Sequence, residues 1–142
     1  MLRKIIGILL ALALVGGGIA YYLWNKPHKT AEGAKPIATL TADALIAEYA
    51  ANTATADTKY LDKVVEVSGT VSDASTNELG RQKITLSTSH TDELGLPAGI
   101  TFIMKENEIV PQATVGINVV LKGICTGYNT DVQFKEAVSV TK

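Results

Sequence analysis

The side chains that could do acid-base chemistry are few in this 142-residue sequence, and they form no recognisable catalytic set. Two carboxylate pairs occur, Asp92 with Glu93 and Glu106 with Glu108. Both pairs lie in polar segments that we expect to be solvated, where nothing would shift a pKa toward catalytic use. No Ser-His-Asp arrangement stands out, and no Gly-x-Ser-x-Gly elbow is present. We therefore predict that the protein is not an enzyme and has no catalytic residues.

Residues that could hold a metal ion or a cofactor are equally sparse. Cys125 is the single cysteine, so the chain cannot form an intramolecular disulfide, and a thiolate zinc site would lack its ligands. His28 lies in a predicted linker and His90 in a polar loop. Neither histidine has a second histidine or a carboxylate at a metal-ligand spacing. The sequence predicts no metal site and no cofactor.

An uncharged run of twenty residues, 5–24, begins close to the N-terminus. At about 1.5 Å per residue, a helix of this length spans roughly the 30 Å hydrocarbon core of a bilayer. Tyr21, Tyr22 and Trp24 stand at its end, where aromatic rings prefer the headgroup region. We predict a transmembrane helix over 5–24, so that the membrane is one partner of the chain.

A cleaved secretory signal is the competing interpretation, because Arg3 and Lys4 form a charged start and residues 18–20 are small enough for a peptidase. The apolar run continues to Trp24, which favours a retained anchor. No cysteine lies near its end, so a lipoprotein lipobox is absent. A short basic tail, residues 1–4, normally stays in the cytoplasm. We predict a single-pass protein of the bacterial inner membrane whose C-terminal domain faces the periplasm.

Beyond the apolar run, residues 25–39 combine two prolines, one glycine and three lysines. This composition is typical of an extended linker, so we place the folded domain at 40–142. Thr41 is a candidate N-cap of a short helix, and Leu40 and Leu45 stand at the positions of a hydrophobic staple. That helix should end within 51–55, where Asn and Thr favour caps and turns.

Five strands should follow, because apolar and polar residues alternate with a period of two. The in-phase apolar sets are Val65, Val67 and Val71; Ile84 and Leu86; Ile100, Phe102 and Met104; Val115, Ile117, Val119 and Leu121; and apolar residues within 132–140. We expect a turn-rich stretch over 72–80, a polar loop over 89–99 and one helical turn within 105–110. Glu136 falls on the apolar phase of the last strand, which indicates a bulge or an edge position.

Two strands carry the same pattern, with a glycine four residues after the first apolar residue. The pattern Val65-x-Val67-x-Gly69-x-Val71 is matched by Val119-x-Leu121-x-Gly123-x-Cys125. Glycine at such positions relieves crowding where a strand bends sharply around a barrel. The match also puts Cys125 in a core register, which predicts an inert buried thiol in preference to a reactive one.

Strand number and glycine-marked bends predict an all-β domain with one or two short helices, namely a five-stranded OB-fold barrel preceded by a transmembrane helix. A five-stranded sandwich fragment is the alternative.

Residues 59–71 and 121–128, followed by Asp131 and Val132, resemble the bacterial tRNA_anti-like family. The resemblance covers roughly 40–142 and implies an OB-type domain behind an N-terminal membrane segment, as in these proteins of mainly Bacteroidota. It implies no established activity and therefore no functional residues. Ala137 stands where relatives often have a second cysteine, so a pairing of that position with Cys125 cannot occur here.

The charge of the domain bears on its partners. From residue 40 onward, eight Lys and Arg residues stand against thirteen Asp and Glu residues, a formal net charge of −5. Nucleic-acid affinity comes largely from Lys and Arg, and single-stranded binding also needs stacking aromatics, of which the domain has few. A single-stranded, tRNA-type nucleic-acid binder is therefore the second hypothesis, and nucleic acid is an unfavoured partner.

The leading hypothesis is a non-enzymatic binding or interaction module of the cell envelope, with a small ligand, glycan, peptide or protein as its partner. OB barrels usually bind across their second and third strands and the adjoining loops. The candidate ligand-binding residues are therefore Lys83, Thr85, Ser87 and Thr101 on those strands and Tyr128 on a later loop. The alternative for each of them is an ordinary solvated strand residue.

Overall fold

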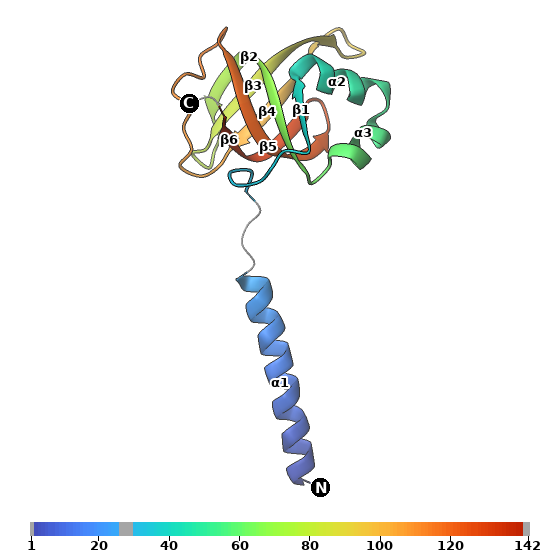
Figure 1. Ribbon diagram of the computed structural model, residues 1–142, viewed down its shortest axis with the longest axis vertical. Coiled ribbons are helices and arrows are strands. Elements are labelled where there is room, and N and C mark those ends of the chain that lie inside the picture. Colours follow the sequence, from blue (N-terminus) through green and yellow to red (C-terminus); the bar gives the residue numbers. More distant parts are fainter. Residues whose placement is uncertain (1, 26–29, 141–142) are drawn as a thin grey trace.

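The computed structural model describes residues 2–25 and 30–140 and begins with one isolated helix, α1 (Leu2–Trp24) (Figure 1). Its segment Lys4–Trp24 has 21 residues with a mean hydropathy of 2.1, and none of it is buried against the rest of the described chain. By length and composition this helix can cross a membrane, and the same properties suit a signal sequence or an anchor.

Five strands close into a barrel. They are β2 (Val64–Thr76), β3 (Gln82–Thr91), β4 (Pro97–Met104), β5 (Asn118–Tyr128) and β6 (Val132–Ser139). Their order is β2-β3-β4-β6-β5, with β2 also paired to β5, so that the sheet returns on itself. All pairings within the barrel are antiparallel except the one between β4 and β6. The predicted five-stranded OB-type barrel is confirmed.

Two short helices, α2 (Ala42–Ala51) and α3 (Thr53–Tyr60), cover one side of the barrel (Figure 1). Thr41 is the N-cap of α2, and its side chain accepts a hydrogen bond from the Ala44 N–H at 3.2 Å, as predicted. This helix ends at Ala51, within the predicted range 51–55, and α3 begins directly after the cap residue. Asn52 explains this, because its backbone N–H ends α2 while its side chain accepts from the Thr55 N–H at 3.0 Å and caps α3.

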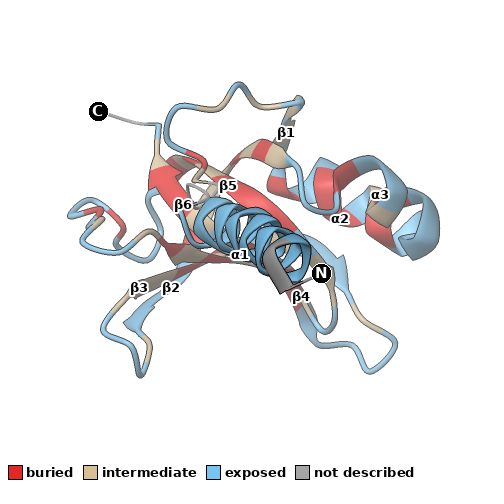
Figure 2. Cartoon of the chain, turned by 90° about the horizontal axis from the view of Figure 1, so that it is seen from below, coloured by how far each residue is buried: buried red, intermediate tan, exposed pale blue. Residues whose placement is uncertain are grey.

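The barrel interior and the underside of the helices form a single apolar core (Figure 2). The rings of Phe102 and Phe134 stack there, with centroids 4.5 Å apart. Most of the predicted inward set is buried, but Val115 and Ile117 are 63% and 49% exposed. The prediction for these two was wrong because β5 begins only at Asn118, and the residues before it belong to a surface loop.

Glycine and polar residues mark the bends and turns as the sequence analysis expected, with different bounds. Strands β2 and β3 extend to Thr76 and Thr91, well into the segments expected to be a turn and a loop. The connections shrink to tight turns at 77–80 and 92–95, in which the side chains of Asn77 and Asp92 accept backbone N–H bonds. Residues 105–110 contain a turn but no helix, which corrects the expected helical turn.

A β-bulge lies at Glu136, where the sequence pattern indicated one. Phe102 pairs with Phe134, but the next partner of β4, Met104, pairs with Ala137, so β6 carries one extra residue. Glu136 has a φ of 50°, a left-handed conformation that a bulge can require.

The expected linker is docked on the domain over its second half, which corrects the boundary at residue 40. Strand β1 (Ala38–Thr41) pairs in parallel with the first half of β2. Ala31 is fully buried, and its N–H donates to the Glu136 carbonyl at 3.4 Å. Extended backbone needs partners for its polar groups, and β2 and Lys122 supply them here. His28 lies outside the described residues.

Candidate ligand-binding face and cleft

The outer face of β3 and β4 carries a hydrogen-bonded polar cluster. Thr85 and Thr101 stand directly opposite one another, with their hydroxyl oxygens 3.3 Å apart. The Thr101 hydroxyl also donates to the Asp131 carboxylate at 3.3 Å, and the Gly99 N–H donates to the same carboxylate at 3.0 Å. All three side chains are half-buried, so the structure brings two predicted candidates together with a residue from the β5–β6 loop.

The two other candidates on β3 lie at the borders of this cluster. Lys83 is half-buried opposite Ile103, and no salt bridge joins it to another described residue. Ser87 is exposed, but its hydroxyl donates to the Thr70 carbonyl at 3.2 Å. Both therefore remain on the predicted face, while Ser87 is already engaged by the backbone.

Tyr128 lies apart from this face, in a cleft of about 490 Å³. The cleft is lined by Tyr49, Ala50 and Thr53 of the helical layer, by the β3–β4 turn region His90, Thr91, Asp92, Glu93 and Leu94, and by Tyr128, Asn129 and Thr130. The Tyr128 ring stacks on the ring of Tyr49, with centroids 5.9 Å apart and planes inclined by 26°. Tyr128 was predicted to belong to the same binding face as the β3 and β4 residues, but it lies in this separate cleft.

The charge of the cleft is one-sided. Asp92 and Glu93 line it, and no Lys or Arg is among its described lining residues. The Asp92 carboxylate also accepts the N–H groups of Leu94 and Leu96, at 2.9 and 2.8 Å, which fixes the turn. An anion would meet repulsion here, whereas hydroxyl, amide or ammonium donors would find acceptors.

Beneath the cleft, the Tyr49 hydroxyl lies 3.3 Å from the Cys125 sulfur, and both residues are buried. Burial, and then the bond to Cys125, raise the pKa of Tyr49. Burial likewise raises the pKa of the Cys125 thiol. A thiol that stays protonated is a poor nucleophile, so the buried, core-register position that the sequence predicted for Cys125 also supports its predicted inertness.

Cys125 should be modified by a water-soluble maleimide on the order of 100-fold more slowly than an exposed cysteine, because reaction requires local opening of the barrel. The reference is Thr126→Cys in a Cys125→Ala background, since Thr126 is the exposed neighbour. Equal rates, measured by mass spectrometry on the folded full chain, would show that Cys125 is accessible.

The carboxylate pairs and histidines show no metal-binding arrangement within the described residues. Glu106 is exposed, and Glu108 accepts from the Ser139 N–H at 3.4 Å. The carboxylates of Asp92 and Glu108 thus accept hydrogen bonds from backbone N–H groups. The absence of catalysis stays a prediction.

Comparison with known proteins identifies the family of the chain. A family model for tRNA_anti-like proteins matches residues 1–137. The chain belongs to the tRNA_anti-like family. The match includes the barrel of this tRNA_anti-like protein up to residue 137 and also its N-terminal apolar helix, whereas the resemblance read from the sequence covered roughly 40–142. No curated protein matches the chain.

Solved structures resemble this tRNA_anti-like protein at low sequence identity. One is a lipoprotein from Klebsiella pneumoniae whose name gives nucleic-acid binding as a provisional function. It has 20% sequence identity and a TM-score of 0.52, and the match covers 72% of this chain and 91% of that chain. Another is the yeast Stn1 and Ten1 structure, with 14% identity, a TM-score of 0.41, and coverage of 82% of this chain and 68% of that chain.

The functional candidate that sequence reasoning missed in this tRNA_anti-like domain is Asp131. Its position just before β6, after the polar pair Asn129 and Thr130, is a signal for an OB-type loop that flanks the binding face. The hydrogen bonds to Gly99 and Thr101 could not be read from spacing, because 30 or more residues separate the partners.

Proposed function

We propose that this tRNA_anti-like protein is a non-enzymatic binding module held at the cytoplasmic membrane of a bacterium, with its OB domain in the periplasm. Its ligand is neutral or cationic and enters the Tyr128 cleft. The observation that carries the proposal is the composition of this cleft, which combines a half-exposed tyrosine ring with carboxylate, amide and hydroxyl groups and has no described Lys or Arg. Concave sites of this kind hold ligands by ring contact and a few polar groups.

The ring pair gives the cleft a rigid platform. Tyr49 is buried and hydrogen-bonded to Cys125, so it holds the Tyr128 ring that stacks on it. A flat aromatic face suits the apolar side of a sugar ring or an extended peptide, and the polar rim suits their hydroxyl and amine groups. A glycan or an amine-bearing peptide of the envelope fits both features.

The proposed location rests on α1 and on the sequence around it. Its apolar length suits a membrane span, and the aromatic residues at its end suit the interface. The prediction that Arg3 and Lys4 remain in the cytoplasm directs the domain outward. A lipoprotein among the structural neighbours is in keeping with an envelope protein.

A single-stranded nucleic-acid binder is the second candidate, and the naming of the Klebsiella neighbour favours it. The surface of this domain argues against nucleic-acid binding. Tyr49, Tyr60, Phe102 and Phe134 are at most 1% exposed, which leaves Tyr128 as the one Tyr, Phe or Trp ring in residues 40–140 that is open to stacking. Together with the acidic domain, this arrangement lacks the basic, aromatic groove that single strands require.

Tyr128→Ala should weaken ligand binding about tenfold, a change of about 1.4 kcal/mol, because it removes the ring platform. The full chain in lipid nanodiscs is titrated with a neutral N-acetylglucosamine oligosaccharide and with a lysine-rich peptide. Tyr128→Phe keeps the ring and should retain affinity for the probe that binds. Binding of neither probe would contradict the role of the cleft, whereas salt-dependent binding of a thymidine 15-mer would favour the second candidate.

The location has its own test. Alkaline phosphatase and, separately, a fluorescent protein that folds only in the cytoplasm are fused after Lys142 in a bacterial host. We expect phosphatase activity in the membrane fraction and no fluorescence. Fluorescence without phosphatase activity would reverse the orientation, and soluble phosphatase activity would show that α1 is removed.

A further inference from the structure

The chain between α1 and the docked linker is short. Asn25 follows the end of α1, and Thr30 precedes Ala31, which is buried against the Glu136 carbonyl. Five peptide units join Asn25 to Thr30, and in any conformation they span at most about 18 Å. If α1 is the membrane anchor of the proposed function, Thr30 therefore lies within about 18 Å of the headgroup layer.

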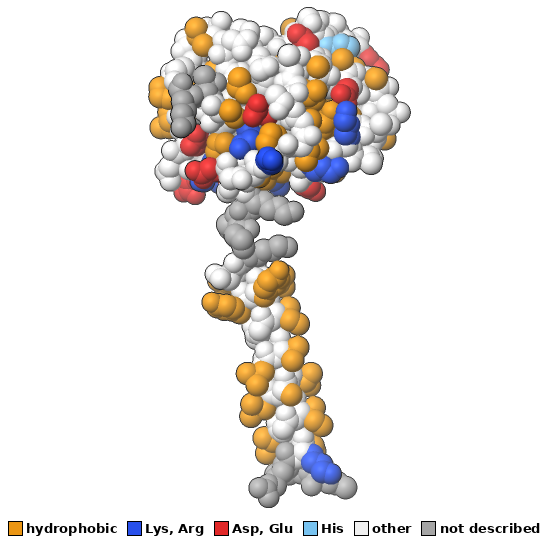
Figure 3. Space-filling model, viewed as in Figure 1, with side chains coloured by type: hydrophobic (Ala, Val, Ile, Leu, Met, Phe, Trp, Pro, Cys, Tyr) orange, Lys and Arg blue, Asp and Glu red, His pale blue; other side chains and the backbone are white. Residues whose placement is uncertain are grey.

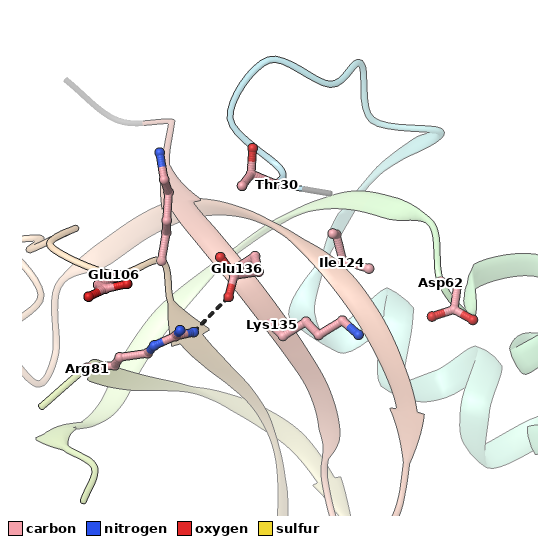
Figure 4. Close-up of a pocket in the computed structure, with 8 residues that line it drawn as sticks. Thr30, Asp62, Arg81, Glu106, Ile124, Lys135 and Glu136 are labelled. Carbon is pink, nitrogen blue, oxygen red and sulfur yellow. Dashed lines mark hydrogen bonds and ion pairs between the residues drawn. The ribbon is translucent and has the colours of Figure 1, made fainter. Parts of the chain in front are cut away.

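This limit decides which end of the barrel faces the membrane. Thr30 lines a cavity of about 520 Å³ together with Asp62, Arg81, Lys105, Glu106, Ile124, Lys135 and Glu136 (Figure 4). Arg81 directly precedes β3, and Thr91 is the last residue of β3. A strand of ten residues extends roughly 33 Å, more than the tether can reach. The tether therefore excludes an inverted arrangement, in which the Tyr128 cleft beside the turn after Thr91 would face the membrane and the cavity end would point away from it.

The membrane-proximal end carries exposed apolar side chains. Leu79, at the tip of the β2–β3 hairpin, is 81% exposed, and Ile109 is 71% exposed. Both line a second hollow that shares Arg81 and Glu106 with the cavity. Apolar side chains beside charged ones are typical of surfaces that lie in the headgroup region.

Positive and negative side chains are mixed at this end. Figure 3 shows such a mixture on the lower half of the domain. In the cavity, Arg81 and Glu136 form an ion pair at 2.7 Å, while no salt bridge to a described residue engages Lys135, Asp62 or Glu106. Figure 4 shows Arg81 and Glu136 on one side of the cavity and Asp62 on the other. Lys105, the third cation of the cavity, pairs with Glu32, so Lys135 and the two carboxylates Asp62 and Glu106 are left to meet a ligand that carries both charges.

We propose that the cavity end of the barrel docks on the membrane that holds α1 and takes phosphoethanolamine headgroups of its lipids. The phosphate meets Lys135, and the primary ammonium donates hydrogen bonds to Asp62, which lies on the same side of the cavity as Lys135 (Figure 4). Leu79 and Ile109 contact the layer between headgroups and chains. The Tyr128 cleft is then presented at the far end of the barrel.

The test compares two hairpin tips that β3 joins. In a Cys125→Ala background, spin labels are placed on the full chain at Leu79→Cys or Leu94→Cys, since both leucines are more than 80% exposed. The label at 79 should collide at least threefold less often with a water-soluble nickel chelate than the label at 94, in nanodiscs of phosphatidylethanolamine and phosphatidylglycerol. Replacing phosphatidylethanolamine with phosphatidylcholine, whose ammonium has no N–H, should reduce this protection, as should Lys135→Gln.

Equal chelate access at 79 and 94 would overturn the docking, and equal protection with both lipids would overturn the choice of phosphoethanolamine. A third label, Leu12→Cys in α1, separates these failures from a failure of the proposed function. If the Leu12 label is reached by membrane-dissolved oxygen and the 79 label is unprotected, the anchor stands and the docking is wrong. If the Leu12 label is outside the bilayer, both are wrong.

Discussion

Replacing Phe102 with alanine should lower the free energy of unfolding of the barrel by about 3–5 kcal/mol. Phe102 is fully buried and stacks on Phe134 at 4.5 Å, so the substitution removes both apolar burial and the ring pair and leaves a cavity between β4 and β6. Because small domains have only about 5–15 kcal/mol of stability, much of the domain should be unfolded at moderate temperature.

Urea titration of the full chain in detergent micelles, followed by the circular dichroism of the strands, measures the Phe102→Ala effect. Phe102→Leu fills most of the same volume and should cost less than half as much. A loss below about 1 kcal/mol for Phe102→Ala would mean that the two rings are not packed at the centre of the core.

Gly123→Val should destabilise the barrel by about 3 kcal/mol or more, and the variant should accumulate poorly. A Cβ at position 123 would lie 3.1 Å from the Cβ of Phe134 and 3.3 Å from the Cβ of Ala137. Those atoms are fixed to the backbone of β6, so β5 and β6 must separate for valine to fit. Gly33→Val is the matched control, because a Cβ there meets nothing within 4 Å.

The same urea titration compares the two glycine variants. An unchanged midpoint for Gly123→Val would show that β5 and β6 are less closely packed than this geometry requires.

The sequence predicted most of the barrel because its main signal is local. Alternation of apolar and polar residues has the period of the pleat, so burial of Val65, Val67, Ile84 and Leu86 followed directly. The paired glycines were informative for the same reason. Gly69 and Gly123 each lie where a side chain would collide with the core, and this crowding is part of the barrel's curvature.

What the sequence did not predict depends on contacts between distant residues. Docking of residues 30–37 requires Lys122 and Glu136, which lie about a hundred positions away. Val115 and Ile117 kept the apolar alternation but lie outside the strand, because the pattern does not report where pairing stops. Asn52 caps the end of α2 and the start of α3. An asparagine is equally compatible with a turn, so the residue type alone did not predict the second helix.

The candidate site was predicted in part. Thr85 and Thr101 face each other because strand parity places them on the outer surface of adjoining strands. Tyr128 lies away from these threonines because its ring stacks on the ring of Tyr49 in the helical layer. No periodicity within β5 predicts that contact.

Docking of the linker also couples the domain mechanically to the membrane. Tension on α1 would load the contacts between the linker and the domain in sequence order. The contacts of Ala31 and Glu32 would be loaded first, then the hydrogen bond from Ile37 to Val64, and last the pairing of β1 with β2. The first contacts to yield are a few polar bonds at the surface, so they would give way before the barrel is strained. Once released, residues 30–37 would lengthen the tether by up to about 27 Å and let the barrel move away from the bilayer without unfolding.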